Sequence, residues 1–491
     1  MSNGVSVKHV AYNIGPPLGL VLLAFLCYLP VLPNYFWEDD FVWLEETRSL
    51  IQNPAFLFDM QPNFRPLFRV YFLLPHILSG ANPATYYLFA ISVHAVTCIV
   101  LYLLFSRLLK DRIAGFGVAA LFAVSNTHSD AIFWLVANCA AFCLMFFAAG
   151  LLCWLYYRQG RRPATMYWLS LICFAFALLS KEDAVTFLFL LVLTDVAFNL
   201  ADGISVKQRV KQYLPFAAVL ASYVMLEVYL QSNPAMRSGS YQPGLFDFNI
   251  LHSATNIIEA LYYMILPLKV KDAQPPMFLL TLTVVAVLLS GLVVADRKRL
   301  LWAFCWSIIA FLPMSFYAWD FYFSIERSAI RRYLYTPSLG ALAFVVIVAA
   351  GLYSKAALRG NAVRKATGTV LIIIFIGVII SSILNVRERS KIWRNRSVVV
   401  ETEVKALKEL HPAVNTPAGF VLYGFAQNKN FEPYMLRTIY GTNDIRTYET
   451  WQELVADQTL KGRYMVVLKD NLMVDYGSGL QLPISYEGII K

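Results

Sequence analysis

The sequence predicts a polytopic α-helical membrane protein with about eleven spans and a small α/β domain at its carboxyl end. Three observations support this fold class. Of the 491 residues, 58% are hydrophobic and 15% are charged, whereas a soluble domain is about 45–50% apolar and about 25% charged. Apolar runs close to the ~20 residues that a helix needs to cross a bilayer recur through residues 1–390. Short clusters of Lys and Arg separate these runs.

The same numbers exclude several classes of protein. A mean hydropathy of +0.56 excludes a disordered chain and argues against a soluble enzyme. The net charge of +10 does not indicate a nucleic-acid partner, because the cations are not gathered on one soluble face. The seven cysteines all lie in apolar segments, without the spacing of a zinc site or a disulfide framework.

The charge clusters predict the topology. Every second connection is rich in Lys and Arg and should be cytoplasmic. The amino terminus is then cytoplasmic, and the acidic loops and the carboxyl-terminal tail are extracytoplasmic. We predict a location in a bacterial inner membrane. The expected spans are 17–32, 84–104, 113–124, 133–156, 166–179, 184–198, 214–230, 277–294, 300–316, 334–352 and 370–384.

Two segments of the membrane domain need their own interpretation. The first span lacks a small-residue cleavage site and is read as a retained signal-anchor; the first outer loop, 34–83, follows it. Segment 252–271 is apolar but contains Glu259 and Pro267. Counting it as a twelfth span would put the basic cluster at 297–299 outside, so we interpret it as a helix at the outer interface.

The tail, 391–491, has the pattern of a small α/β domain. Apolar residues at helical spacing predict a helix over 393–410. Segments 419–423 and 464–468 read as short buried strands, with a helical stretch at 450–458 between them. The tail carries no recognisable catalytic signature.

The strongest candidate site is Trp37-Glu38-Asp39-Asp40-Phe41, directly after the first span. Adjacent carboxylates repel one another, so such a cluster binds a cation or contains a base with a raised pKa. The oxygen ligands suit magnesium, manganese or calcium. A solvated acidic loop is the alternative interpretation.

Other charged residues fall on the same predicted face. His128 and Asp130 occupy a tight loop after the third span, and Lys181-Glu182-Asp183 interrupts two apolar runs. Charges at that depth are costly, so they tend to be paired and functional. A structural ion pair that caps two helices is the alternative for the second group.

Several arginines lie on the wrong side for the positive-inside rule. Arg65 follows the acidic loop, and Arg327, Arg331 and Arg332 precede the tenth span. A bound phosphate would explain them, since the guanidinium fork matches its oxygens; pairing with Asp320 or Glu326 is the alternative. A further cluster suits anionic lipid head groups or means that the topology is wrong by one span: Arg387, Arg389, Lys391, Arg394 and Arg396.

Together these residues predict an outward-facing cavity with carboxylates at its centre and cations at its wall. The cations suit a lipid-linked phosphate, and a carboxylate suits the removal of a hydroxyl proton. Those are the requirements for moving a sugar from a polyprenyl phosphate to an alcohol. The sequence has no nucleotide-binding glycine loop, which also favours a donor carried by the membrane.

The ordered motifs resemble the GT-C class of integral-membrane glycosyltransferases, in the protein O-mannosyltransferase-like branch that often carries tetratricopeptide repeats. The resemblance covers roughly residues 15–410. The motifs, in order, are Asp39-Asp40, Arg65-Pro66-Leu67, Gly80-Ala81-Asn82-Pro83, His94, His128-Ser129-Asp130 with Trp134, Leu179-Ser180-Lys181-Glu182, and Arg332-Tyr333-Leu334-Tyr335-Thr336-Pro337-Ser338.

The resemblance implies a polyprenyl-phosphate sugar donor and inverting transfer, with Asp39 or Asp40 as the catalytic base. It also implies that Asp130 helps to bind a metal, with Asp40, or the acceptor, and that Arg332 faces the donor phosphate. The remaining residues that we expect to bind substrate are Glu38, Arg65, His128, Lys181, Glu182, Arg331 and Tyr335.

The chain departs from the family in two places. Ser125-Asn126-Thr127-His128 replaces the usual His-Pro-x-His, and no tetratricopeptide repeats follow the last span. The acceptor therefore stays open among a glycan, a lipid-linked saccharide and a protein hydroxyl. A transporter or flippase of lipid-linked sugars, or an assembly subunit for them, is the competing class, although such transporters usually show internal repeats.

Overall fold

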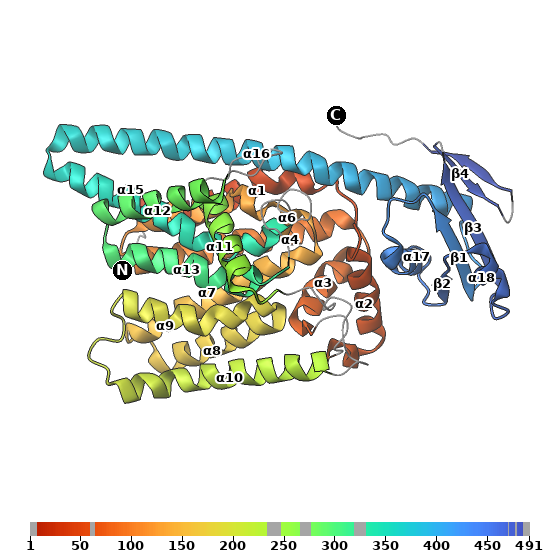
Figure 1. The fold of residues 1–491 in the computed structure, drawn as a ribbon, viewed down its shortest axis with the longest axis horizontal. Helices are drawn as coiled ribbons and strands as arrows, with labels where there is room; N and C mark the ends of the chain where they lie inside the picture. The colour runs from red at the N-terminus through yellow and green to blue at the C-terminus, as the bar shows by residue number, and fades with distance from the viewer. Residues whose placement is uncertain are drawn as a thin grey trace.

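The chain forms a long helical bundle with a small sheet domain at one end (Figure 1). The computed structural model describes residues 7–58, 64–232, 247–265, 276–318, 330–469, 471–476 and 479–484. This arrangement confirms the predicted fold class of a helical membrane protein with a carboxyl-terminal α/β unit.

The helices of the bundle follow the apolar runs of the sequence. Prolines stand in the first turn of several of them, where their missing N–H costs nothing. The α-helices are α1 (Val7–Tyr28), α2 (Asp40–Gln52), α3 (Pro66–Ser79), α4 (Pro83–Leu108), α5 (Arg112–Ala123), α6 (Ser129–Phe133), α7 (Cys139–Arg158), α8 (Pro163–Ser180), α9 (Phe187–Ala197), α10 (Val206–Ser232), α11 (Ile250–Ile265), α12 (Met277–Val294), α13 (Arg297–Ser315), α15 (Ser338–Leu358) and α16 (Asn361–Leu410). The short 3-10 helices are η1 (Leu29–Val31), η2 (Pro54–Phe58), η3 (Asn126–His128), η4 (Val136–Asn138), η5 (Glu182–Thr186), η6 (Ile330–Leu334) and η7 (Lys429–Phe431).

Eight helices in the described part of the chain are long and apolar enough to cross a membrane, and α5 is a shorter apolar helix. Two predicted spans are less regular. Segment 184–198 forms η5 and an α9 of 11 residues, and segment 300–316 forms most of α13, whose first turn carries Arg297 and Arg299. The number of spans therefore stays a prediction.

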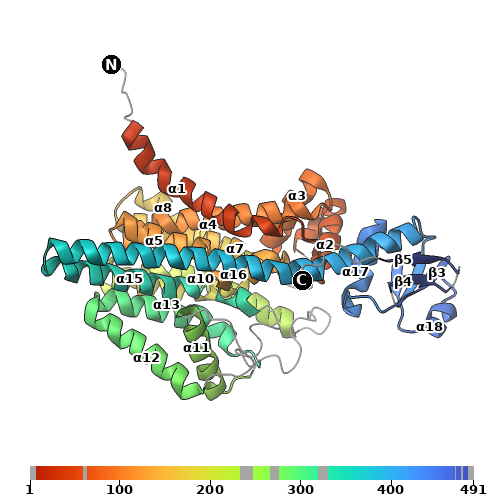
Figure 2. The same ribbon diagram turned by 90° about the horizontal axis from the view of Figure 1, so that it is seen from above.

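The segment that we interpreted as interfacial forms α11 over Ile250–Ile265, and its continuation at 266–271 lies outside the described residues. α11 runs across the direction of the neighbouring helices (Figures 1 and 2). Its polar side chains face the protein: Ser253 contacts Ser315 at 2.6 Å, and the Asn256 amide donates to the Ser315 carbonyl at 3.0 Å. Buried apolar residues of α11, such as Leu261 and Met264, face the protein as well, so the interfacial position of this segment stays a prediction.

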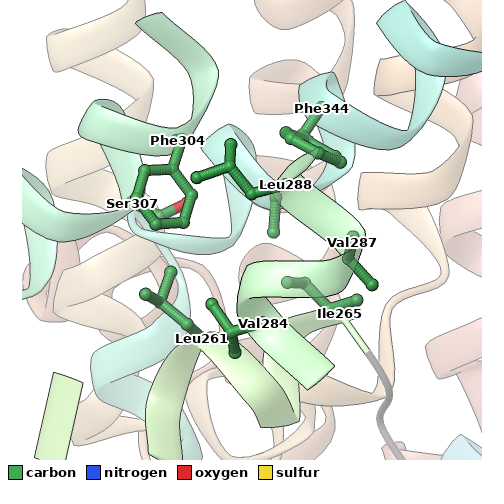
Figure 3. A pocket seen from close by; sticks show the side chains of 9 residues that line it. Leu261, Ile265, Val284, Val287, Leu288, Phe304, Ser307 and Phe344 are labelled. Carbon is green, nitrogen blue, oxygen red and sulfur yellow. The ribbon is translucent and has the colours of Figure 1, made fainter. Parts of the chain in front are cut away.

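Figure 3 shows a pocket between α11, α12, α13 and α15 that belongs to the packing of the bundle. Its single hydroxyl, Ser307 Oγ, donates to the Pro337 carbonyl at 2.9 Å. The pocket carries no charged side chain and therefore offers no chemistry. Its lining residues are Leu261, Ile265, Val284, Val287, Leu288, Phe304, Ser307, Ala341 and Phe344.

Three basic connections meet at the end of the bundle away from the sheet domain. Residues from the α4–α5, α12–α13 and α15–α16 connections line one pocket, among them Asp111, Arg299 and Lys355. The turn from α15 to α16 lies at that end in Figure 1. Gathering the Lys/Arg-rich connections on one side is what the positive-inside rule requires of a single orientation.

The helix α16 joins the bundle to the sheet domain. Its 50 residues run continuously from Asn361 to Leu410, and it extends along the bundle into the sheet domain (Figures 1 and 2). The predicted domain boundary at 390 and 391 therefore lies inside one helix. Side chains near the start of α16, such as Ile373, are exposed, whereas Trp393 and Leu407 near its end are buried.

The carboxyl-terminal domain is a five-stranded mixed sheet with two helices. The strand order is β2-β1-β3-β4-β5; β2, β1 and β3 are parallel, and β4 and β5 are added antiparallel. The structure confirms the two predicted strands and the helical stretch between them. The elements are β1 (Ala418–Tyr423), α17 (Glu432–Tyr440), β2 (Ile445–Thr447), α18 (Trp451–Ala456), β3 (Gly462–Lys469), β4 (Leu472–Asp475) and β5 (Gln481–Pro483).

Candidate active site

The acid loop, residues 37–41, joins η1 to the start of α2 at the end of the bundle that carries the sheet domain (Figure 1). Phe36 and Phe41, which flank the carboxylates, are buried with ring centres 6.0 Å apart. Phe36 also packs edge-on against Tyr86 of α4 at 5.4 Å. These rings fix the loop to the bundle, so its polar side chains have defined positions.

Asp40 is the first residue of α2, and it is fully buried. Its Oδ2 accepts a hydrogen bond from the Trp37 backbone N–H at 2.9 Å, and its Oδ1 accepts one from the Val136 N–H at 3.1 Å. Burial, together with the charge of Asp39, raises the pKa of Asp40. Because both oxygens hold backbone groups, Asp40 ties the acid loop to η4 and is poorly placed to contact a substrate.

Asp39 differs from its neighbour in exposure and in partners. It is half-buried, and its Oδ1 accepts a hydrogen bond from the Trp134 indole Nε1 at 2.7 Å. Burial raises the pKa of Asp39 to about 7, with the positive charge of Arg332 acting in the opposite direction. A carboxylate whose pKa lies near neutral pH is suited to accept a proton at that pH.

Arg332 of η6 lies on the face of the same indole. Its guanidinium carbon is 4.5 Å from the centre of the Trp134 ring and 4.8 Å from that of Tyr333. One aromatic side chain therefore holds a carboxylate at its edge and a cation on its face. The ring system keeps the two charges separate while leaving them electrostatically coupled.

Lys181 lies near the Tyr333 ring, which Arg332 also contacts. Its Nζ lies 5.1 Å from the centre of the Tyr333 ring and 2.6 Å from Asp183 Oδ2. Although burial opposes it, the negative charge of Asp183 raises the pKa of Lys181, so this cation stays charged. The structure thus links Lys181 to Arg332 through Tyr333.

Arg65 and Glu182 form a bidentate ion pair. Arg65 Nη2 lies 2.8 Å from both carboxylate oxygens of Glu182, and Nε lies 3.1 Å from Oε2. The side chains are 13% and 26% exposed. Burial pushes the pKa of Glu182 upward, but the charges of Arg65 and Lys181 outweigh it and lower that pKa overall. The Lys181-Glu182-Asp183 segment therefore carries the ion pairs that we weighed as the structural alternative.

Asp130 is held by α16. Arg389 Nη2 lies 3.2 Å from its Oδ1, and the Trp393 indole donates to the same oxygen at 3.2 Å. Asp130 is fully buried, and Arg389 is 5% exposed. Arg389, which we placed in a cluster suited to lipid head groups, therefore faces the protein.

His128 and Tyr335 belong to a separate buried cluster with His94. His128 Nε2 contacts Ser338 Oγ at 2.8 Å, and the His94 ring contacts the Tyr335 hydroxyl at 2.5 Å. As expected for a polar residue inside a span, His94 joins helices, because its Nε2 also contacts the Ala123 carbonyl of α5 at 3.1 Å. The hydrogen bonds of the two histidines reach Tyr335, Ser338 and the carbonyl groups of Phe122 and Ala123.

The remaining predicted residues lie at the border of the site. Glu38 is half-buried and interacts electrostatically with Arg396 and Arg332, and burial raises its pKa. Arg331 is buried, with its guanidinium 5.5 Å from the Tyr263 ring of α11. Arg327, Asp320 and Glu326 lie outside the described residues.

The carboxylates that we proposed as metal ligands have other partners. Asp40 accepts two backbone N–H groups, and Asp130 accepts from Arg389 and Trp393. Cations and N–H donors around a carboxylate do not fit a divalent ion, which prefers a shell of oxygens. Across the described ranges, no group of three or more His, Cys, Asp or Glu side chains is placed to hold a metal. The surroundings of Asp40 and Asp130 therefore do not fit a metal ion.

Sequence reasoning treated Trp134 and Tyr333 only as parts of motifs, and it missed Gln427 altogether. Trp134 could have been found because it follows closely on the polar run 125–130, which carries His128 and Asp130. Gln427 gives no such signal. It contacts the backbone of Glu38 from 389 residues away, a distance that no local pattern spans.

Comparison with known proteins supports the predicted resemblance. No family model matches the chain. Protein O-mannosyl-transferase Tmtc1 of Drosophila melanogaster is 31% identical over 197 residues, 36% of this chain and 22% of that protein. Human protein O-mannosyl-transferase TMTC2 is 30% identical over 159 residues, 31% of this chain and 18% of that protein. The chain spans about a fifth of the length of these curated relatives.

A solved structure matches over nearly the whole length. Apo ArnT from Cupriavidus metallidurans aligns with a TM-score of 0.51 and 13% identity, covering 94% of each chain. The same protein bound to undecaprenyl phosphate aligns over the same shares with a TM-score of 0.49. The resemblance to GT-C class glycosyltransferases is therefore confirmed: this chain is similar to protein O-mannosyl-transferases over about a third of its sequence and has the fold of ArnT.

Proposed function

We propose that this protein is a membrane glycosyltransferase that moves a sugar from a polyprenyl-phosphate donor to an acceptor hydroxyl on the extracytoplasmic face. The observation that carries this proposal is the Trp134 indole, which donates to Asp39 at 2.7 Å and holds Arg332 on its face at 4.5 Å. A base and a phosphate-binding cation are thereby kept on two sides of one rigid ring.

In the proposed reaction Asp39 is the base. The acceptor hydroxyl gives its proton to the Asp39 carboxylate while its oxygen forms a bond to the anomeric carbon of the sugar. The bond from that carbon to the phosphate oxygen breaks, and its electron pair stays on the phosphate. Attack opposite the leaving group inverts the anomeric centre.

Arg332 would stabilise the departing polyprenyl phosphate. Its planar guanidinium offers several donors, and stacking on Trp134 and Tyr333 fixes their direction before the donor binds. Positive charge placed where negative charge develops lowers the barrier of such a transfer. Lys181, whose Nζ lies 5.1 Å from the centre of the Tyr333 ring, adds a second positive charge near Arg332.

Asp40 has a different task in this proposal. One of its backbone hydrogen bonds comes from Trp37 within the acid loop, and the other, from Val136, holds that loop against η4. Asp40 would therefore position its neighbour without meeting the substrate. The predicted roles of Arg65, Glu182, His128, Asp130, Arg331 and Tyr335 in substrate binding remain proposals.

The extracytoplasmic location rests on the charge pattern. The basic connections gather at the end of the bundle opposite the acid loop, and such connections are normally cytoplasmic. A reporter fused after Lys491 tests this: signal in the cytoplasm would place the acid loop on the wrong side of the membrane for the proposed donor face.

Transfer itself is tested with membranes that contain the protein, a radiolabelled polyprenyl-phosphate sugar and a panel of glycan, lipid-linked and peptide acceptors. We expect Arg332→Gln to raise the donor KM and lower kcat, and Arg332→Lys to lie between it and wild type because a lysine keeps the charge without the fork. Arg359→Gln, at an exposed position, is the matched control. Binding of the donor without transfer to any acceptor would favour a flippase instead.

A further inference from the structure

The carboxyl-terminal domain holds the backbone of the acid loop through one side chain. Gln427 lies in the connection after β1, and it is 3% exposed. Its Oε1 accepts from the Glu38 backbone N–H at 3.3 Å, and its Nε2 donates to the Glu38 carbonyl at 3.2 Å. The two ends of one amide thus engage both backbone groups of a single residue, which fixes the orientation of that residue as well as its distance.

The residue that Gln427 holds has an uncommon backbone conformation. Glu38 has φ of 45°, in the left-handed region that few non-glycine residues adopt. Such a conformation costs free energy and persists where the surroundings impose it. Asp39 is the next residue, so the peptide that Gln427 holds sets the direction from which the Asp39 side chain leaves the chain.

Gln427 is itself fixed to the bundle. The N–H of the preceding residue, Ala426, donates to both carboxylate oxygens of Glu403 at 3.1 and 3.0 Å. Glu403 is 1% exposed on α16. A continuous set of contacts therefore runs from α16 through the β1 connection to the acid loop.

The place of this contact in the sheet domain is informative. Ligands of parallel α/β sheets commonly bind beyond the carboxyl ends of the strands, and the connection after β1 leaves that edge. At this edge of the sheet, the chain contacts the acid loop of the membrane domain. A second contact lies nearby, because Arg437 of α17 meets Glu45 of α2 at 3.3 Å and the Arg437 carbonyl accepts from Arg48 at 2.8 Å.

We propose that Gln427 is a positioning residue for Asp39, and that the carboxyl-terminal domain serves to hold the acid loop in its working conformation. This inference rests on the proposed function of Asp39 as the base. Without the Gln427 amide, Glu38 can return to a negative φ, which turns the following peptide and moves the Asp39 carboxylate away from Trp134. The Asp39 carboxyl then becomes more hydrated, and its proton affinity falls.

Gln427→Met tests this, because methionine keeps the volume of the side chain and removes both hydrogen bonds. We expect kcat of the membrane-embedded full chain to fall by about tenfold, the loss of two modest hydrogen bonds, with the donor KM unchanged. The acidic limb of the pH–rate profile should move to lower pH. Gln452→Ala, at an exposed position on α18, is the control and should match wild type.

A second variant tests whether the loss of kcat comes from the backbone conformation of Glu38 or from a general loss of stability. Asparagine tolerates the left-handed region better than glutamate, so Glu38→Asn added to Gln427→Met should recover part of the lost kcat. In the wild-type background the same substitution should bring no such gain. Equal effects of Glu38→Asn in both backgrounds would overturn the proposal.

The remaining outcomes separate the positioning role of Gln427 from the proposed function of Asp39. A wild-type kcat and pH profile for Gln427→Met, with an inactive Asp39→Asn, would overturn the positioning role and leave the proposed function intact. A fully active Asp39→Asn would overturn the proposed function itself. Loss of activity and of thermal stability together, with an unmoved acidic limb, would show that Gln427 only stabilises the fold.

Discussion

The loops after α1 and after α5 both place an aspartate at the end of an apolar helix, yet the structure treats the two acids differently. Asp39 stays half-buried, with an indole N–H at one oxygen and Arg332 across the ring. Asp130 is fully buried between Arg389 and Trp393 of α16. The difference shows that the groups that face an aspartate, and not its place at the end of an apolar helix, decide whether it is fully paired inside the protein. The local sequence leaves that choice open.

Asp39→Asn should produce the largest effect on activity. Asparagine keeps the size of the side chain and the hydrogen bond from Trp134, but it cannot take a proton, so we expect transfer to fall by about 10²- to 10⁴-fold. The rate of sugar transfer by membranes with equal amounts of inserted protein measures this. Asp202→Asn, in an exposed turn, is the control. Activity close to wild type would remove Asp39 from the role of base.

Asp130→Asn should act on the fold. The substitution leaves Arg389 buried without its negative partner, and breaking a buried ion pair costs about 3–5 kcal/mol of the free energy of unfolding. Thermal unfolding of the purified protein in detergent measures the change. Lys405→Gln breaks the exposed pair with Glu401 and should cost under about 1 kcal/mol. Equal stability of the two variants would contradict the distinction between the loops.

The pH dependence of the transfer rate tests whether Asp39 is the base. Burial raises the pKa of this carboxyl from 3.8 to about 7, so a base is lost to protonation as the pH falls below about 7. We expect the transfer rate to decline about tenfold for each unit below that value. A rate that is flat between pH 5 and about 8 would contradict this assignment.

The same shift has a consequence for stability. The folded state holds the Asp39 proton more tightly than the unfolded state, so its contribution to stability is present below the unfolded pKa of 3.8 and is lost as the pH rises through about 7. Asp39→Asn should therefore be at least as stable as wild type at about pH 8. Thermal unfolding across the pH range measures the difference.

Chelation should have the smallest effect. The oxygens of Asp40 and Asp130 already accept hydrogen bonds from N–H groups, so we expect transfer to continue in excess chelator. Loss of activity that added magnesium or manganese restores would show that a metal acts through groups other than these two carboxylates.

The sequence predicted the class of fold because hydrophobic length and charge clusters depend on neighbouring residues alone. It also grouped Lys181 and Glu182 with the acid loop, and the structure connects Lys181 to Arg332 through Tyr333. It did not distinguish Asp39 from Asp40, because their hydrogen bonds come from Trp134 and Val136, two residues of the connection between α5 and α7. Nor did it pair Asp130 with Arg389, since that contact forms only when α16 packs against the bundle.

The unbroken helix α16 limits how the two halves of the protein can move. Arg389 and Trp393 fasten it to the bundle, and Glu403, ten residues beyond Trp393, fastens the sheet domain to it. Hinge-like swinging of the sheet domain would have to bend this rod or break those buried contacts. Under the proposed function, the sheet domain and the acid loop that it holds would therefore keep one relative position while substrates bind and leave.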